Sequence, residues 1–431
     1  MPEKLNHCRA ANGRVSADRV TQRQQNVKMR SCAVARYEFM GRLPKVIDST
    51  KQVYMRVSWD IFCSVVDNFG DIGVTWRLAR QLVAEQDMAV CLWVDDLNAL
   101  CPLCPEADAN LDEQSLSGVT VKQWPTRWPG AEAADVVIEA FACDLPAAYI
   151  AAMAERERPS LWLNLEYLSA EDWVEGCHGL PSLQAKGLHK FFFFPGFSAQ
   201  TGGLLREADL LDRRRAFQHS PTARAQFLQG LGVDVAPAGR LMSLFGYENS
   251  ALAGWLDCLA RDTEATLLLV PAGRLDAELQ MWLQIADWPV GASMVRGQLT
   301  VQKIPFVNQL DYDRLLWSCD LNLVRGEDSF IRAQWAGRPL LWHIYPQHEQ
   351  AHLIKLEAFL QHYCAALSPA AQQAVQAQWQ AWNRGEPMTQ SWLAVQAVWP
   401  ELTDHAEKWC QRLAKQQNMS QGLVQFYLNW L

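Results

Sequence analysis

Short apolar runs alternate with amphipathic helical patterns along most of this chain, in two successive series. The first series has apolar runs at 57–66, 88–94, 119–124, 135–140, 160–165 and 190–194. The second has runs at 241–245, 265–270, 299–304, 321–324 and 339–342. Strands that alternate with helices typically form a parallel sheet covered by helices on both faces. Two such series in 431 residues predict an α/β protein with two Rossmann-like, doubly wound domains facing a cleft.

The two series suggest where the domains begin and end. The first predicted domain covers residues 55–207 and the second covers 239–399. Between them, residues 208–238 are charged and lack strand patterns, which indicates a linker. Residues 400–431 form a helical C-terminal tail, which the sequence permits to pack back on the first domain. Residues 1–54 are basic and weakly periodic, typical of a disordered tail or a transit peptide, but we favour an over-extended coding start.

Charge and cysteine usage limit the classes of function. Residues 58–431 hold 27 basic and 43 acidic residues, so we expect no direct nucleic-acid binding, although a basic acceptor is compatible. No apolar run reaches the roughly 18 residues that span a bilayer, so no membrane association is expected. The twelve cysteines lack a disulfide framework spacing, which indicates a reduced, cytoplasmic protein. Cys101 and Cys104 form a lone CxxC pair, which is weak support for a zinc or redox site.

Polar residues follow the apolar run 321–324, where a predicted strand passes through a tight turn into a helix. Ligands bind at the carboxyl ends of strands in such sheets, and a helix start favours phosphate. Arg325 and the backbone at Asp328 and Ser329 therefore predict a phosphate-binding site. An N-cap would require only one such residue, so capping alone does not explain this cluster.

A second cluster, Asp67–Gly73, joins the first strand of the chain to a helix predicted at 74–83. Because its two carboxylates repel phosphate, this turn is a poor phosphate cradle. Paired carboxylates suit a guanidinium ion, which they can orient while one of them acts as a base. An Asx turn with a helix cap would account for one of the two aspartates but not easily for both.

These two clusters resemble motifs of the EarP family, the arginine rhamnosyltransferases of translation factor EF-P. Asn164–Tyr167 and Phe194–Phe197 also fit that family, and the resemblance runs from about Met55 to the C-terminus. It implies a GT-B glycosyltransferase fold and an inverting transfer of L-rhamnose from dTDP-β-L-rhamnose to an arginine of EF-P. It implies no cofactor beyond this donor substrate.

The resemblance also assigns roles to individual residues. It makes Asp71 the general base, and Asp67 would position the acceptor or Asp71. Glu327 would contact the sugar or the acceptor guanidinium. It places recognition of the thymine base at Phe306, Gln309 and Tyr312, where Tyr312 stands in place of an expected Phe. The other residues expected to bind the donor are Phe245, Tyr247 and Tyr345. Without the family, core packing is the better explanation for Phe245, Phe306 and Tyr312 taken singly.

Two further motifs suggest metals but have simpler explanations. His348–His352 matches HExxH, a zinc peptidase pattern, but no third ligand follows at the expected spacing. Asp311 and Asp313 form a DxD pair at the start of a predicted helix, where an N-cap and first-turn charge explain them. We therefore expect no metal. The remaining alternatives are a GT-B enzyme with another sugar nucleotide or acceptor, and a non-catalytic nucleotide-binding module.

Overall fold

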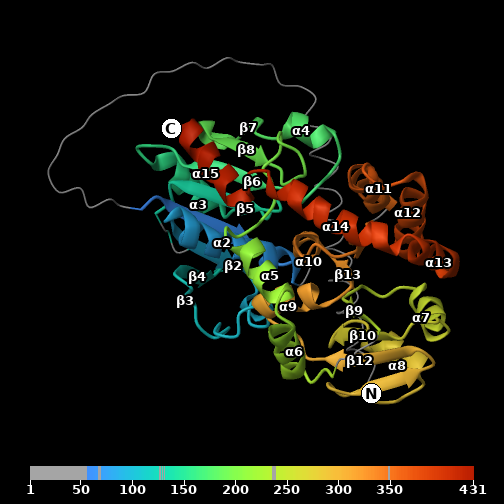
Figure 1. Ribbon diagram of the computed structural model, residues 1–431. Coiled ribbons are helices and arrows are strands. Elements are labelled where there is room, and N and C mark those ends of the chain that lie inside the picture. The colour runs from blue at the N-terminus through green and yellow to red at the C-terminus, as the bar shows by residue number, and fades with distance from the viewer. Residues whose placement is uncertain are drawn as a thin grey trace, which may run out of the picture.

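The structure is a computed structural model that describes residues 56–66, 69–125, 128, 130, 132–234, 239–347 and 350–431. It contains two β-sheets, each covered by helices (Figure 1). The predicted extension at 1–54 lies outside the described residues, and so does Asp67. Within the described part of the chain, no helix is both long and apolar enough to cross a membrane.

The first sheet has eight strands in the order β3-β4-β2-β1-β5-β6-β8-β7. They are β1 (Ser58–Cys63), β2 (Ala89–Val94), β3 (Glu113–Leu116), β4 (Val119–Gln123), β5 (Val136–Ala140), β6 (Leu161–Leu165), β7 (Pro181–Leu183) and β8 (His189–Phe193). The six central strands are parallel, as their apolar runs predicted. The edge strands β3 and β7 are antiparallel and were not predicted.

Helix α2 (Gly70–Gln86) connects β1 to β2 and carries the buried residues Ile72, Trp76 and Leu82. The helix begins at Gly70 rather than at Val74, so the second half of the predicted turn is already helical. Helices α3 (Ala147–Glu155) and α4 (Trp173–Cys177) lie in later connections of the same sheet.

The second sheet has six strands in the order β11-β12-β10-β9-β13-β14. They are β9 (Arg240–Leu244), β10 (Thr266–Pro271), β11 (Ser293–Arg296), β12 (Leu299–Ile304), β13 (Leu321–Arg325) and β14 (Leu340–His343). The edge strand β11 is antiparallel to β12 and was not predicted, whereas the other five strands match the predicted series. The helices between these strands are α7 (Leu252–Ala260), α8 (Asp276–Leu283), α9 (Gln309–Ser318) and α10 (Asp328–Trp335).

The segment proposed as a linker contains two helices, α5 (Leu210–Gln218) and α6 (Pro221–Gly230). Both pack against α9 of the second half. The Arg224 guanidinium donates to the Ser318 carbonyl oxygen at 2.9 and 3.0 Å, which fixes α6 to the end of α9. The described part of this segment is therefore folded onto the second half.

Five helices follow the second sheet, and the last of them returns to the first. They are α11 (Ala351–Cys364), α12 (Pro369–Arg384), α13 (Thr389–Ala397), α14 (Trp399–Ala414) and α15 (Met419–Trp430). Figure 1 shows α14 and α15 crossing from the second half to the first, where α15 packs against α2. Met419 and Leu423 of α15 belong to the buried core around β1 and α2.

Candidate active site

Two adjoining cavities lie where the carboxyl ends of both sheets face each other. The first, here the aromatic pocket, is lined by Phe245, Tyr247, Phe306, Tyr312 and Arg325, among others. The second, here the carboxylate pocket, is lined by Asp71, Tyr167, Glu327, Tyr345 and Lys355, among others. Gly70, Gly326 and Glu327 line both cavities, so the two pockets meet there.

Asp71 lies in the first turn of α2 and is buried. Its Oδ2 atom accepts a hydrogen bond from the Val66 N–H at 2.9 Å, and its Oδ1 atom accepts one from the Tyr167 hydroxyl at 3.2 Å. The positive end of the α2 dipole further favours a negative charge at this position. The carboxylate is thus held in a fixed orientation at the wall of the carboxylate pocket.

Tyr167 is a site residue whose role the sequence did not reveal. It follows β6 and stacks on Phe141 with a centroid distance of 4.4 Å. Phe141 has a φ angle of 56°, a conformation that is strained for an aromatic residue and typical of functional sites. The Asn164–Tyr167 motif indicated that this strand end matters, but not that Tyr167 contacts Asp71.

Glu327 lies between β13 and α10, where the two pockets meet. Its Oε2 atom accepts a hydrogen bond from the Leu168 N–H at 2.9 Å. Its Oε1 atom is shielded from solvent and has no hydrogen-bond partner among the described residues. Burial raises the pKa of Glu327 to about 8, because the Leu168 N–H and Lys355 only partly offset the cost of desolvation. This carboxyl group therefore holds a proton at neutral pH.

Glu327→Gln is expected to stabilise the protein at pH 8 when it is measured without added ligand. The pKa of Glu327 in the folded state lies above its ordinary value, so its contribution to stability falls as the pH rises towards about 8. The glutamine stays neutral, and we expect it to raise the free energy of unfolding by about 2–4 kcal/mol at pH 8 and by little near pH 4. Urea unfolding at both values measures this, with the exposed Glu157→Gln as control. Equal stability of wild type and variant at pH 8 would contradict the prediction.

Arg325 places a positive charge in the wall of the aromatic pocket. Its guanidinium lies 4.4 Å from the ring centroid of Phe245 and 4.8 Å from that of Tyr247. Asp328 and Ser329 begin α10 directly after it, so free N–H groups and a positive dipole end lie beside this charge. The arrangement suits a bound anion.

The negative charge of the Asp328 side chain is compensated, so it would not repel an anion bound at this place. The Arg77 Nε atom of α2 donates to the Asp328 Oδ1 atom at 2.9 Å, and the Arg77 side chain is buried. Arg77 of the first half thus compensates the negative charge of Asp328 at the anion site of the second half.

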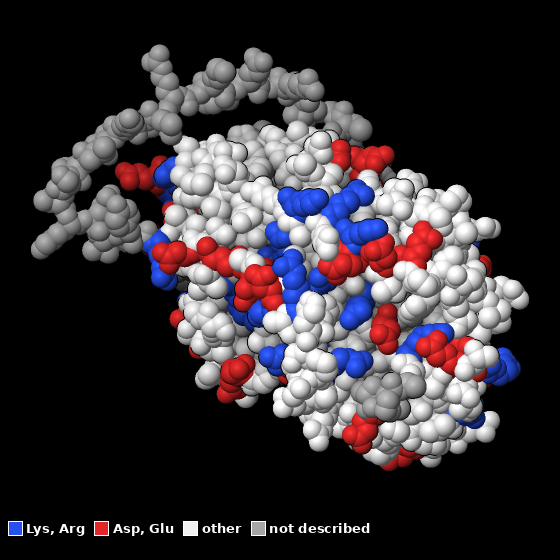
Figure 2. Space-filling model, viewed as in Figure 1, with Lys and Arg blue, Asp and Glu red and all other residues white. Residues whose placement is uncertain are grey.

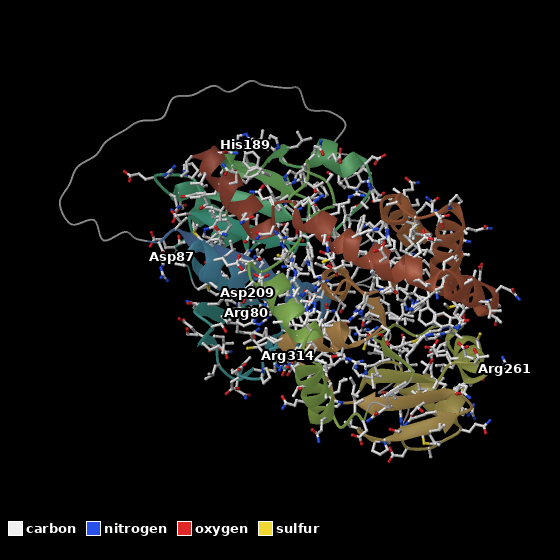
Figure 3. The ribbon with its side chains drawn as sticks, viewed as in Figure 1. Arg80, Asp87, His189, Asp209, Arg261 and Arg314 are labelled. Carbon is white, nitrogen blue, oxygen red and sulfur yellow. The ribbon has the colours of Figure 1, made fainter. Side chains whose placement is uncertain are left out.

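Gln309 lines the aromatic pocket, but both ends of its amide contact α2. Its Nε2 atom donates to the Gly73 carbonyl oxygen at 2.9 Å, and its Oε1 atom accepts from Arg80 Nη2 at 2.9 Å. Arg80 lies between the two halves in Figure 3, above the α9 residue Arg314. Base reading by Gln309 stays a prediction, and it would require the amide to leave these partners.

A buried charge network joins the two halves behind the pockets. Asp313 accepts from Arg332 Nε at 2.7 Å and from Arg332 Nη2 at 2.6 Å. Arg332 Nη1 also donates to Glu207 of the first half at 2.7 Å, and Arg77 lies 3.5 Å from the same carboxylate. The sequence did not reveal this network, because its members are far apart in the chain. Figure 2 shows acidic and basic residues interspersed over the visible face of the molecule.

A family model described as "Elongation-Factor P (EF-P) rhamnosyltransferase EarP" matches residues 59–428. The chain belongs to the EarP family. The protein-arginine rhamnosyltransferase of Pseudomonas putida is 61% identical over 88% of this chain and 100% of its own length. That of Shewanella oneidensis is 43% identical over 85% of this chain and 97% of its own.

Solved structures agree with the EarP assignment. A structure that explains EarP-mediated arginine glycosylation of translation elongation factor EF-P shares 46% identity and a TM-score of 0.65, covering 87% of this chain and 100% of that one. A glycosyltransferase of Rickettsia africae, 9% identical with a TM-score of 0.51 over 87% of this chain and 99% of that one, shares the fold alone. The predicted GT-B fold is therefore confirmed. So is the predicted enzyme class, a protein-arginine rhamnosyltransferase.

Most residues expected to bind the donor in the EarP resemblance gather in one place. The aromatic pocket is lined by Phe245, Tyr247, Phe306, Gln309, Tyr312, Arg325, Asp328 and Ser329. Tyr345 lines the carboxylate pocket instead, with its ring 5.5 Å from that of Tyr247. Residues that the sequence did not single out include Phe69 and Lys355, which line one pocket each. The roles of all these residues stay predictions.

The two metal-like motifs are accounted for by other contacts where the structure describes them. Asp313 binds Arg332, whereas Asp311 pairs with Arg314 at 3.0 Å. His348 and Glu349 lie outside the described residues, and the His352 Nδ1 atom accepts from the Gln347 N–H at 3.1 Å. In the described ranges, no three acidic, His or Cys side chains come together as metal ligands. Membership of the EarP family favours the transferase over the zinc peptidase and the non-catalytic module.

Proposed function

We propose that this chain transfers L-rhamnose from dTDP-β-L-rhamnose to an arginine side chain of elongation factor P, with inversion at the anomeric carbon. The observation that carries the proposal is the meeting of two chemically different pockets at Glu327, between the two sheets. One pocket offers aromatic rings and an anion site, and the other offers carboxylates. A nucleotide-sugar in the first would place its sugar at the entrance to the second.

The aromatic pocket is the proposed donor site. Phe306 and Tyr312 offer rings for stacking on thymine, a contact of about 1–3 kcal/mol per base in other proteins. Arg325 and the start of α10 would then hold the diphosphate and stabilise the charge that develops as dTDP leaves. Since Arg77 pairs with Asp328, that acidic side chain is already compensated.

The carboxylate pocket is the proposed acceptor site. An arginine guanidinium is protonated at neutral pH and must lose a proton as it reacts. In the proposed step, one nitrogen attacks the anomeric carbon and the bond from that carbon to the diphosphate oxygen breaks. Asp71 takes the proton from the nitrogen, and dTDP leaves. Glu327 would contact the guanidinium or the sugar, and Asp67, outside the described residues, stays a predicted positioning residue.

The direct test is the intact mass of purified EF-P after incubation with this protein and dTDP-rhamnose in EDTA. We expect a gain of one deoxyhexose, because the proposed mechanism uses no metal or other cofactor. A gain only after Mg²⁺ or Zn²⁺ is added would contradict the metal-independent mechanism. Parallel incubations with other nucleotide-sugars test the alternative donors, and a faster transfer from one of them would replace dTDP-rhamnose. Because a translation factor works in the cytoplasm, we place the reaction there.

A further inference from the structure

The hydroxyl group of Tyr312 is enclosed at the aromatic pocket, and its capacity to form hydrogen bonds is not used there. The residue lies on α9, and its ring meets that of Phe245 at a centroid distance of 5.9 Å. The hydroxyl oxygen is shielded from solvent and has no hydrogen-bond partner among the described residues. An enclosed hydroxyl without a partner destabilises a protein relative to the phenylalanine that would fill the same space. A ligand that supplies the missing acceptor would remove that cost.

The surroundings of this hydroxyl indicate which part of a ligand it meets. Burial raises the pKa of Tyr312 well above its usual range, and among the neighbours that act on it are Ser329, Asp328 and Arg325. The Ser329 hydroxyl lies beside that of Tyr312, but the two form no hydrogen bond of normal geometry. The Tyr312 hydroxyl therefore keeps its proton at neutral pH and lies at the anion site of β13 and α10.

We propose that the Tyr312 hydroxyl donates a hydrogen bond to the diphosphate of the nucleotide-sugar donor. The inference rests on the proposed donor site and adds a contact that phenylalanine at this position would lack. The ring can still stack on the base, because the hydroxyl projects from its far edge. Hydrogen bonds to charged acceptors are about twice as strong as neutral ones, so the contact would strengthen donor binding and help hold the leaving dTDP.

The test compares wild type with Tyr312→Phe in binding to dTDP and to thymidine. We expect the variant to bind dTDP about tenfold more weakly and thymidine equally well, because only dTDP carries the diphosphate. The ligand-free variant should unfold at the same temperature as wild type or higher, since no hydrogen bond is lost. Equal affinity for dTDP would overturn the inference. An equal loss for dTDP and thymidine would also do so, because the hydroxyl would then act on the base.

The matched control is Tyr363→Phe, which removes a hydroxyl from a buried tyrosine of α11. Tyr363 lines neither pocket, so its variant should bind dTDP as wild type does. Binding of dTDP to the wild-type protein distinguishes an error in the role of the hydroxyl from an error in the donor site. If wild type binds dTDP and Tyr312→Phe binds it equally, only the role of the hydroxyl is wrong. If wild type does not bind dTDP, the donor assignment itself is wrong.

Discussion

Asp71→Asn is expected to lower the rate of rhamnose transfer about 10²–10⁴-fold and to leave dTDP affinity unchanged. The asparagine keeps the size of the side chain and can still accept a hydrogen bond, but it cannot take the proton from the acceptor. Donor binding should survive because Asp71 lines the carboxylate pocket and not the aromatic pocket. Single-turnover transfer followed by intact mass, with calorimetry for dTDP, measures both quantities.

Tyr167→Phe is the companion variant for this experiment. It removes the hydroxyl that donates to Asp71 at 3.2 Å and keeps the ring that stacks on Phe141. We expect a smaller loss of rate than for Asp71→Asn, because the base remains and only its orientation is relaxed. Wild-type rates for Asp71→Asn would assign the base to another group. A parallel loss of dTDP affinity would show that the variant disturbs the donor site.

Asp313→Asn is expected to lower the free energy of unfolding by about 3–5 kcal/mol. Asp313 is buried and receives two hydrogen bonds from Arg332, which is also buried. Removing its charge leaves Arg332 paired with Glu207, a carboxylate that Arg77, bound to Asp328, also approaches. Weakening a buried pair on one side is costly because the charge of Arg332 is then only partly compensated. Urea unfolding of the full chain measures the change.

Asp311→Asn is the control for this prediction, because it removes the other carboxylate of the same DxD pair. Asp311 pairs with the exposed Arg314 three residues away on α9, and such surface pairs contribute about 0–1 kcal/mol. We expect its variant to unfold almost as wild type does. Similar losses of unfolding free energy for both variants would mean that Asp313 does not stabilise the protein through the buried network.

The central strands were predictable because burial on both faces gives continuous apolar runs, as in β5 and β13. The edge strands β3, β7 and β11 escaped prediction since they are short, exposed and partly polar. The same limit applies to α5 and α6. Their charged sequences resemble a linker, and the packing that makes them helical comes from α9, about a hundred residues later.

The features of the site were also predictable only in part. Arg325, Asp328 and Ser329 were predictable because their position after a strand indicates a ligand site in any sheet of this kind. The pairing of Asp328 with Arg77 was not, because the two residues are 251 positions apart and meet only when both halves have folded. The enclosed Glu327 carboxyl group was equally hidden, since its raised pKa arises mainly from desolvation on burial and only in smaller part from charges such as that of its sequence neighbour Asp328.

Helix α15 gives the chain an order of assembly during synthesis. The core of the first sheet includes Met419, Leu423 and Tyr427, which the ribosome adds only after the whole second sheet. The Met419 N–H also donates to the Leu204 carbonyl oxygen at 3.0 Å, beside the point where the first half ends. Although the first half is translated first, it reaches its final packing last. A nascent chain that stops before α15 would therefore hold Asp71 beside a first core that still lacks these three side chains.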